Sequence, residues 1–213
     1  MEKKDNYRIQ ANQAKERFLT FDQEALIHKF NLSYDADYLF VNFLCQPYRI
    51  DRRTGIPEKA EGGQWVNGDT YNEVMTLLDL LCDSRDHRRL SGQWKNMQSF
   101  GLMFHQNLLE NQRNSWADRF QDAPEVFRRG CLALNGIPVP GADIGFAVEF
   151  FDGMRVAVQF WFGDDEFFPR LRYLWDENAL QYIHYETMYF AIPLVLARID
   201  ALGKTLPVDV GID

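Results

Sequence analysis

The sequence predicts a single α+β domain spanning residues 1–213, built around an antiparallel sheet. Residues 144–162 alternate between apolar and other side chains as a β-hairpin does. Both ends of the chain show the apolar spacing of helices that would cover such a sheet. A length of 213 residues is at the upper end of one ordinary domain, and no linker interrupts the chain.

The N-terminal part of the chain is predicted to form a helix followed by two strands. From Tyr7 to Phe30, apolar residues recur at nearly helical spacing, with a charged opposite face. From Asp37 to Ile50 the apolar period changes to two, and Gln46 and Pro47 indicate a bend between two strands. The glycine-rich stretch from Arg52 to Thr70 then predicts a long irregular loop.

Helices are predicted again in the middle of the chain. Asp69 and Thr70 can cap a helix with a leucine-rich buried face. The charged run from Asp83 to Arg89 predicts the solvated turn that follows this helix. Apolar residues between Met97 and Trp116 indicate a second helix, and Pro124 suits the first turn of a third helix that runs to about Leu134.

The strand register of the hairpin predicted at residues 144–162 can also be assigned. A three-residue loop at residues 151–153 keeps the large apolar side chains of both strands on one face, with the glycine of the loop in a bulge. This register pairs Phe150 with Met154 and sets Glu149 opposite Arg155 on the outer face. A third strand is predicted from Arg170 to Trp175, and a final, largely buried helix from about Glu186.

Composition excludes several classes of protein. A hydrophobic content of 46% is ample for a core that forms without metal or disulfide help. The formal net charge of −8 argues against nucleic acid as a partner. The three cysteines lack metal-ligand spacing, and no apolar run is long enough to span a membrane. We therefore expect a soluble protein of the reducing cytoplasm, with no membrane partner.

Carboxylates are concentrated after the hairpin, in residues 163–169, which we call the acidic corner. It contains Asp164, Asp165 and Glu166, and Asp176 follows at the end of the next predicted strand. If the two strands are neighbours, these groups could bind a hard cation or act as an acid and base pair. The spacing matches no calcium loop, and the alternative is a solvated turn whose Asp side chains accept backbone amides.

Aromatic residues and one histidine extend the set of candidate ligand-binding residues. If Trp161 or Trp175 faces outward, the corner becomes an aromatic-walled acidic pocket for a cationic or flat ligand, and a place in the core is the alternative. None of the four histidines stands four residues from another histidine or from a cysteine, the spacing of a helical metal site. His184, close to Glu186, is the best candidate among them, with a packed, hydrogen-bonded histidine as the alternative.

No dinucleotide, phosphate-loop or nucleophile-elbow motif appears, so catalytic residues, metal and cofactor stay unassigned. The leading hypothesis is an accessory protein without catalysis of its own, which binds a small molecule, a metal or a partner protein at residues 161–176. The rival is a metal-assisted or carboxylate-based hydrolase that uses Asp164, Glu166 and Asp176, with His184 in support. A subunit that works through oligomer contacts is a third hypothesis.

The C-terminal third also resembles a known family. The segments that carry the resemblance are Phe160 to Phe167, Leu174 to Asp176, Tyr182 to Ile183, and Glu186 before an apolar helix. They resemble the domain-of-unknown-function family 3786 of bacteria and archaea, whose members tend to show a Trp-x-Gly-Asp-x-Glu-Phe-Pro run and a Leu-Phe-Asp element. Phe168 before Pro169, and Trp175 in place of the usual Phe, make this chain a divergent member. The resemblance implies no established activity. Some relatives carry the domain after a four-cysteine iron–sulfur segment, a cysteine set that is missing here.

Overall fold

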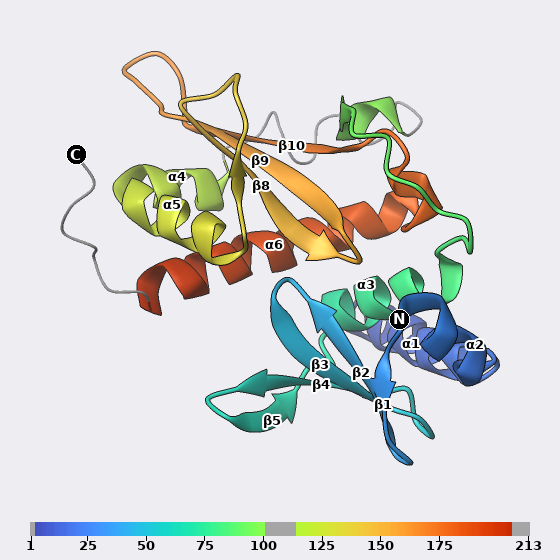
Figure 1. Ribbon diagram of the computed structural model, residues 1–213. Coiled ribbons are helices and arrows are strands. Elements are labelled where there is room, and N and C mark those ends of the chain that lie inside the picture. The colour runs from blue at the N-terminus through green and yellow to red at the C-terminus, as the bar shows by residue number, and fades with distance from the viewer. Residues whose placement is uncertain (1–2, 101–113, 206–213) are drawn as a thin grey trace. The chain divides into compact units, whose positions relative to one another are not determined.

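A computed structural model describes residues 3–100 and 114–205 (Figure 1). The described residues form helices and two antiparallel sheets, which confirms the predicted α+β class. The chain divides into two compact units. Unit 1 comprises Met1–Leu90 and Asn178–Leu194, and unit 2 comprises Ser91–Glu177 and Val195–Asp213. The prediction that residues 1–213 form one domain stays a prediction.

Unit 1 combines helices with a five-stranded antiparallel sheet in the order β1-β2-β3-β4-β5. Its described elements are α1 (Lys3–Phe18), α2 (Gln23–Phe30), β1 (Ser33–Tyr34), β2 (Tyr38–Phe43), β3 (Gln46–Asp51), β4 (Pro57–Glu61), β5 (Gln64–Asn67), α3 (Tyr71–Asp83), a 3₁₀ turn (Ala179–Gln181) and the first part of α6 (Tyr185–Thr205). Helices α1, α2 and α3 gather beside the sheet (Figure 1). The buried side chains of β2 and β3 form one face of this sheet.

Three predictions for unit 1 were wrong in detail. The N-terminal helix is two helices, because the Asp22 side chain caps α2 by accepting hydrogen bonds from two backbone amides of its first turn. The β2–β3 hairpin turns at Leu44 and Cys45, both with φ of 51°, and not at the following Gln46 and Pro47. The stretch predicted as an irregular loop contains the β4–β5 hairpin.

The β4–β5 hairpin escaped prediction because most of its side chains are polar and only partly buried. An edge hairpin of this kind lacks the clear apolar alternation that marks a strand in the sequence. Its turn is formed by Gly62 and Gly63, which both have positive φ values. Residues without a side-chain penalty in this region of φ are the usual choice for such a turn.

Helix α3 begins where the sequence predicts. Thr70 and Glu73 form a capping box, in which each side chain accepts a hydrogen bond from the other residue's backbone amide. The buried Glu73 carboxylate also accepts hydrogen bonds from Tyr48 Oη at 3.0 Å and Lys59 Nζ at 3.0 Å. These contacts tie α3 to the sheet, and α1 packs along α3. The position of α3 matters because it carries two of the acidic residues described below.

Unit 2 contains a second five-stranded antiparallel sheet, in the order β6-β10-β9-β8-β7. Its described elements are β6 (Trp94–Asn96), a 3₁₀ turn (Met97–Ser99), α4 (Ser115–Asp122), α5 (Pro124–Ala133), β7 (Ile137–Pro138), β8 (Ile144–Phe151), β9 (Met154–Trp161), β10 (Arg170–Asp176) and the rest of α6. The predicted helix at Pro124 and the predicted third strand are confirmed. The helix predicted between Met97 and Trp116 falls largely outside the described residues.

The β8–β9 hairpin has the predicted register from Ile144 to Glu149 but a different turn. Glu149 lies opposite Arg155, as predicted. The turn has two residues, Asp152 and Gly153, with φ of 51° and 79°, and Phe151 pairs with Met154. A bulge between Glu149 and Phe151 restores the register that the shorter turn would otherwise shift. The predicted pairing of Phe150 with Met154 was therefore wrong, because the extra residue sits within β8 and not in the loop.

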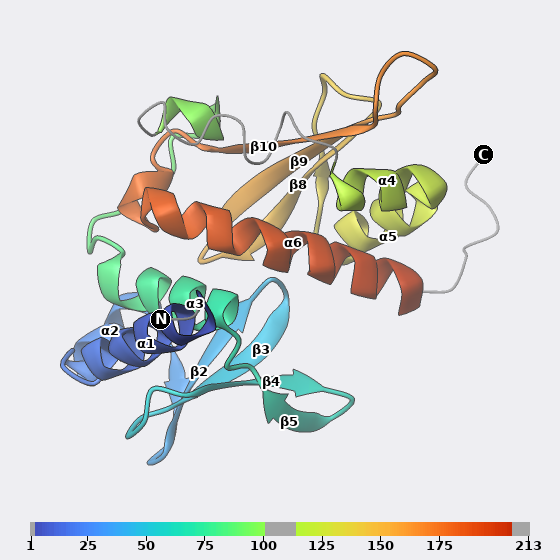
Figure 2. The ribbon, with the colours of Figure 1, turned by 180° about the vertical axis from the view of Figure 1, so that it is seen from behind.

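The inner face of the second sheet packs on helices of unit 2. Figure 2 shows α5 beside the C-terminal part of α6. A Cβ atom at Gly130 of α5 would lie 1.9 Å from the carbonyl oxygen of Ile199, and one at Gly203 of α6 would lie 1.9 Å from that of Val126. Only glycine at these two positions allows the helices to approach so closely.

Candidate functional site

The acidic corner is an ordered, exposed turn. Asp164 Oδ1 accepts hydrogen bonds from the backbone amides of Glu166 at 2.9 Å and Phe167 at 2.8 Å. These two bonds lower the pKa of Asp164, because they stabilise its charged form. The side chains of Asp165 and Glu166 are exposed to solvent and take no part in these two hydrogen bonds. The carboxylate at the centre of the predicted site therefore holds its own loop in shape.

Asp176 and Trp175 lie at the other end of β10 from the corner. Seven residues of strand separate the two ends by roughly 20 Å at about 3.4 Å per residue. Asp176 is buried and accepts hydrogen bonds from the amides of Ser91 at 2.9 Å and Gly92 at 2.8 Å. Trp175 is fully buried and packs edge-on against Phe150. The structure does not bring either residue to the acidic corner.

Of the two tryptophans that were candidates to line a pocket at the corner, Trp161 lies next to the corner and is partly exposed. Its ring lies under two guanidinium groups, those of Arg170 at 4.6 Å and Arg172 at 5.0 Å from the ring centroid. The ring is thus already in contact with two cations from the neighbouring strand β10. Phe167 and Phe168, at the tip of the corner, are 69% and 67% exposed, so they wall no pocket there.

The other two predicted site residues, His184 and Glu186, belong to unit 1, whereas the acidic corner belongs to unit 2. Glu186 is exposed in the first turn of α6. His184, which immediately precedes α6, contacts two acidic residues that the sequence analysis did not single out. These are Asp79 and Asp83, one helical turn apart on α3 and so on the same side of it. We call Asp79, Asp83 and His184 the acid–histidine cluster.

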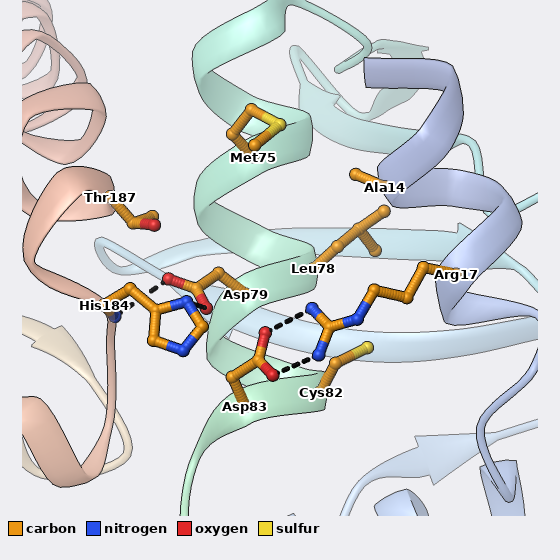
Figure 3. A pocket seen from close by; sticks show the side chains of 9 residues that line it. All are labelled: Ala14, Arg17, Met75, Leu78, Asp79, Cys82, Asp83, His184 and Thr187. Atoms are coloured by element: carbon orange, nitrogen blue, oxygen red, sulfur yellow. Dashed lines mark hydrogen bonds and ion pairs between the residues drawn. The ribbon is translucent and has the colours of Figure 1, made fainter. Parts of the chain in front are cut away.

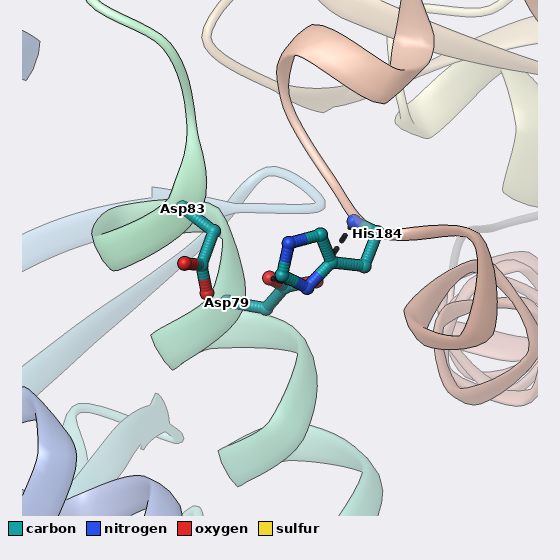
Figure 4. A group of neighbouring side chains, drawn as sticks. All are labelled: Asp79, Asp83 and His184. Carbon is teal, nitrogen blue, oxygen red and sulfur yellow. Dashed lines mark hydrogen bonds and ion pairs between the residues drawn. The ribbon is translucent and has the colours of Figure 1, made fainter.

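The ligand atoms of the acid–histidine cluster converge (Figure 4). One carboxylate oxygen from each Asp and one ring nitrogen of His184 all lie within 4.8 Å of one another. Asp79 Oδ2 accepts a hydrogen bond from the His184 backbone amide at 3.0 Å, which holds the start of α6 against α3. Asp79 Oδ1 lies 3.0 Å from His184 Nδ1, yet it accepts no hydrogen bond of good geometry among the described residues.

The two carboxylates differ in their affinity for protons because their hydrogen-bond partners differ. Burial raises the pKa of Asp79 to about 6, and the neighbouring Asp83 adds to this rise, against the opposing hydrogen bonds from Thr187 and the His184 amide. Burial acts in the same direction on Asp83, but hydrogen bonds with Arg17 and Asp79 outweigh it, and the pKa of Asp83 is lowered. Asp79 therefore binds a proton more readily than Asp83 does.

The cluster lines one side of a small pocket (Figure 3). Arg17 of α1 closes the opposite side, and its guanidinium donates to both carboxylate oxygens of Asp83, with Nη1 2.5 Å from Oδ2. Cys82 and Thr187 also line the pocket, together with apolar side chains of α1 and α3. Burial raises the pKa of Cys82 to about 12, so its thiol is protonated at neutral pH.

A family model described as "Domain of unknown function (DUF3786)" matches residues 22–198. The chain belongs to the DUF3786 family. The resemblance seen in the sequence is thereby confirmed, and all three residues of the acid–histidine cluster lie within the matched segment. Arg17 precedes this segment. A search of curated proteins and a search of solved structures each gave no match. No helix of the described residues is long and apolar enough to cross a membrane.

The volume of the pocket and its metal-ligand atoms limit what this DUF3786 protein could bind there. The cavity measures about 80 Å³. Sites for small organic molecules usually measure about 300–1,000 Å³, whereas one water takes roughly 30 Å³ of liquid volume. An ion with a few waters therefore fits, and an organic substrate does not fit entirely inside. Two carboxylate oxygens and one imidazole nitrogen suit a divalent cation such as Mn²⁺ or Zn²⁺.

One feature of the sequence could have indicated the acid–histidine cluster. Asp79 interrupts the leucine-rich face of α3, and a charged residue between Leu78 and Leu80 is expected to have a partner when the helix is buried. Asp83 was assigned to a solvated turn, but it is the last residue of α3 and its side chain is only 12% exposed. The distance of about one hundred residues between Asp79 and His184 hides their contact from any local motif.

Proposed function

We propose that this chain is an accessory protein, without catalysis of its own, that binds a divalent cation at the acid–histidine cluster. The observation that carries the proposal is the convergence of three ligand atoms from Asp79, Asp83 and His184 within 4.8 Å of one another. We assign the ligand to this pocket in preference to the acidic corner. Asp164 is committed to its own turn, and Asp176 and Trp175 are buried at the far end of β10.

The charge of the pocket supports a cation. Asp79 and Asp83 supply two carboxylates against the single guanidinium of Arg17. Asp79 is buried with one oxygen that lacks a hydrogen bond, and a buried carboxylate in this state gains from a cationic partner. The 3.0 Å between Asp79 Oδ1 and His184 Nδ1 also equals the spacing of adjacent ligands around an octahedral ion, about 3.0 Å when each bond is about 2.1 Å.

The test is metal binding by the full chain after EDTA treatment, followed by native mass spectrometry and calorimetry with Zn²⁺ and Mn²⁺. We expect one equivalent of cation on the wild type and at least a tenfold loss of affinity, the order seen even for weaker perturbations of metal sites, in Asp79→Asn and His184→Gln. The matched control is Asp164→Asn, which removes a carboxylate from the acidic corner and should bind as the wild type does. A wild type that binds no cation, or a loss confined to Asp164→Asn, would refute the proposal.

One observation favours a second candidate, a metal-assisted or carboxylate-based hydrolase at the same pocket. The His184 side chain is 59% exposed beside the buried carboxylate of Asp79, an arrangement that suits a general base. The candidate predicts metal-dependent hydrolysis of p-nitrophenyl acetate or p-nitrophenyl phosphate that His184→Gln abolishes. Absence of turnover by the metal-loaded wild type would leave the accessory role.

A further inference from the structure

The acid–histidine cluster is already in contact with a cation, the guanidinium of Arg17. Arg17 lies in the last turn of α1, and its two terminal nitrogens donate to the two oxygens of Asp83. This fork-to-fork contact is the geometry in which arginine binds a carboxylate most specifically. The Asp83 side chain is 12% exposed and that of Arg17 is 50% exposed. The Asp83 carboxylate is therefore largely shielded from solvent, and the Arg17 guanidinium can reach it.

We infer that Arg17 is a resident counter-ion that a bound divalent cation displaces from Asp83, so that occupancy of the site is transmitted to the end of α1. The inference rests on the proposed function and adds a regulatory residue to it. With Arg17 in place, the guanidinium and a divalent cation would together carry three positive charges against two carboxylates. Without it, the cation alone balances Asp79 and Asp83.

Displacement is easy for Arg17 because its charge does not have to be buried elsewhere. The side chain is half exposed, so the guanidinium can turn into water while its methylene groups stay on the protein. The guanidinium carbon already lies 5.3 Å from the centroid of the Phe21 ring, a contact that does not depend on Asp83.

The backbone of Arg17 connects this exchange to the turn between α1 and α2. The Arg17 carbonyl accepts hydrogen bonds from the Thr20 amide at 2.9 Å and the Thr20 hydroxyl at 2.7 Å. The Phe21 amide donates to the carbonyl of Phe18 at 3.1 Å. Release of the side chain that ties this turn to α3 should therefore increase the opening of these backbone hydrogen bonds.

Arg17 also differs from the ligands in its relation to the family. Asp79, Asp83 and His184 lie inside the segment that matches the DUF3786 model, residues 22–198, and Arg17 lies before it. The proposed ligands thus come from the matched segment, while the counter-ion comes from the helix that precedes it.

The decisive experiment compares Zn²⁺ affinities by calorimetry on the EDTA-treated full chain. Arg17→Met removes the competing cation, and we expect it to bind Zn²⁺ about fivefold more tightly than the wild type, the factor that corresponds to a partly exposed ion pair. The matched control is Arg53→Met, which removes an equal charge from an exposed pair with Asp37 at 3.0 Å in the same unit. Its affinity should equal that of the wild type.

Each outcome distinguishes this inference from the proposed function. If the wild type binds no Zn²⁺, the proposed function fails, and the inference fails with it. If the wild type binds Zn²⁺ and Arg17→Met binds equally or more weakly, the site stands and the inference is overturned, because Arg17 would then be neutral or would position Asp83. An equal gain in Arg53→Met would reduce the effect to net charge and would also overturn it.

Amide hydrogen exchange supplies a readout that affinity alone does not give. Saturating Zn²⁺ should accelerate exchange of the amides of Thr20 and Phe21 in the wild type, because the tie to Asp83 is released. In Arg17→Met these amides should exchange rapidly with or without Zn²⁺. Exchange that slows on Zn²⁺ binding in the wild type would contradict displacement. Urea unfolding of both variants verifies that they are folded under the conditions used.

Discussion

The acidic corner and the acid–histidine cluster contain the same type of group in opposite surroundings. Asp164, Asp165 and Glu166 are neighbours in sequence and lie in solvent, whereas Asp79 is 7% exposed and its partner His184 is far away in the chain. Water stabilises the exposed carboxylates at no structural cost, but a buried carboxylate needs a proton or a cation. The difference teaches that burial, and not local density of acidic residues, identifies the carboxylate with an unmet electrostatic requirement.

The largest expected effect concerns an aromatic residue that the sequence analysis placed at the corner. Trp175→Ala should lower the free energy of unfolding by roughly 3–5 kcal/mol, as for other buried aromatic residues truncated to alanine. Trp161→Ala should cost only about 1 kcal/mol, since it removes partly exposed stacking with Arg170 and Arg172. Urea unfolding measures both. Equal losses would mean that Trp175 is no more part of the core than Trp161.

The second prediction tests the burial of Asp79 through the pH dependence of stability. Its pKa rises from 3.8 to about 6 in the folded protein, so the folded state binds more protons than the unfolded state between these values. Stability from this group is present below pH 4 and is lost as the pH rises through 6, by about 3 kcal/mol at about 1.4 kcal/mol per unit. Asp79→Asn should lack this loss.

The measurement is urea unfolding of wild type and Asp79→Asn in EDTA from pH 4 to pH 7, where the difference between the two proteins cancels the other titrating groups. Asp164→Asn serves as the control, because its side chain has a lowered pKa and its titration falls below this range. A difference between wild type and Asp79→Asn that stays constant with pH would show that Asp79 is ionised in the folded protein at no cost.

Periodicity predicted much of the fold but little of the site. The β8–β9 hairpin, β10 and the start of α3 could be predicted because alternation and capping are local properties of the sequence. The β4–β5 hairpin was missed because its polar strands carry no such period. The cluster was missed because the contact of Asp79 with His184 depends on how α3 packs against the start of α6, which no local pattern records.

The acidic corner also shows why sequence neighbours on a strand do not make a site. Asp164 and Asp176 flank the same strand, and an extended strand keeps its two ends far apart. The pattern of β10 indicated the strand correctly, but the inference that its end groups converge ignored its length. Within such a segment, only residues that are paired across strands, such as Trp161 and Arg170, are brought together by the predicted sheet.

A smaller effect is expected inside the corner itself. Asp164→Ala removes the acceptor of the Glu166 and Phe167 amides, so these two amides should exchange with solvent markedly faster. Asp165→Ala removes a neighbouring carboxylate that makes neither bond and should leave both rates unchanged. Hydrogen exchange followed by NMR measures them. Equal acceleration in both variants would mean that charge, and not the hydrogen bonds of Asp164, orders the turn.

The smallest effect on stability is expected at the tip of the corner. Phe167 and Phe168 are 69% and 67% exposed, so their replacement by serine should change the free energy of unfolding by no more than about 0.5 kcal/mol. The turn itself should persist, because Asp164 bonds to backbone amides that serine retains. Urea unfolding and the exchange rates of the same amides test both expectations. A loss of several kcal/mol would place these rings in the core, and the acidic corner would then resemble the acid–histidine cluster in being formed around buried groups.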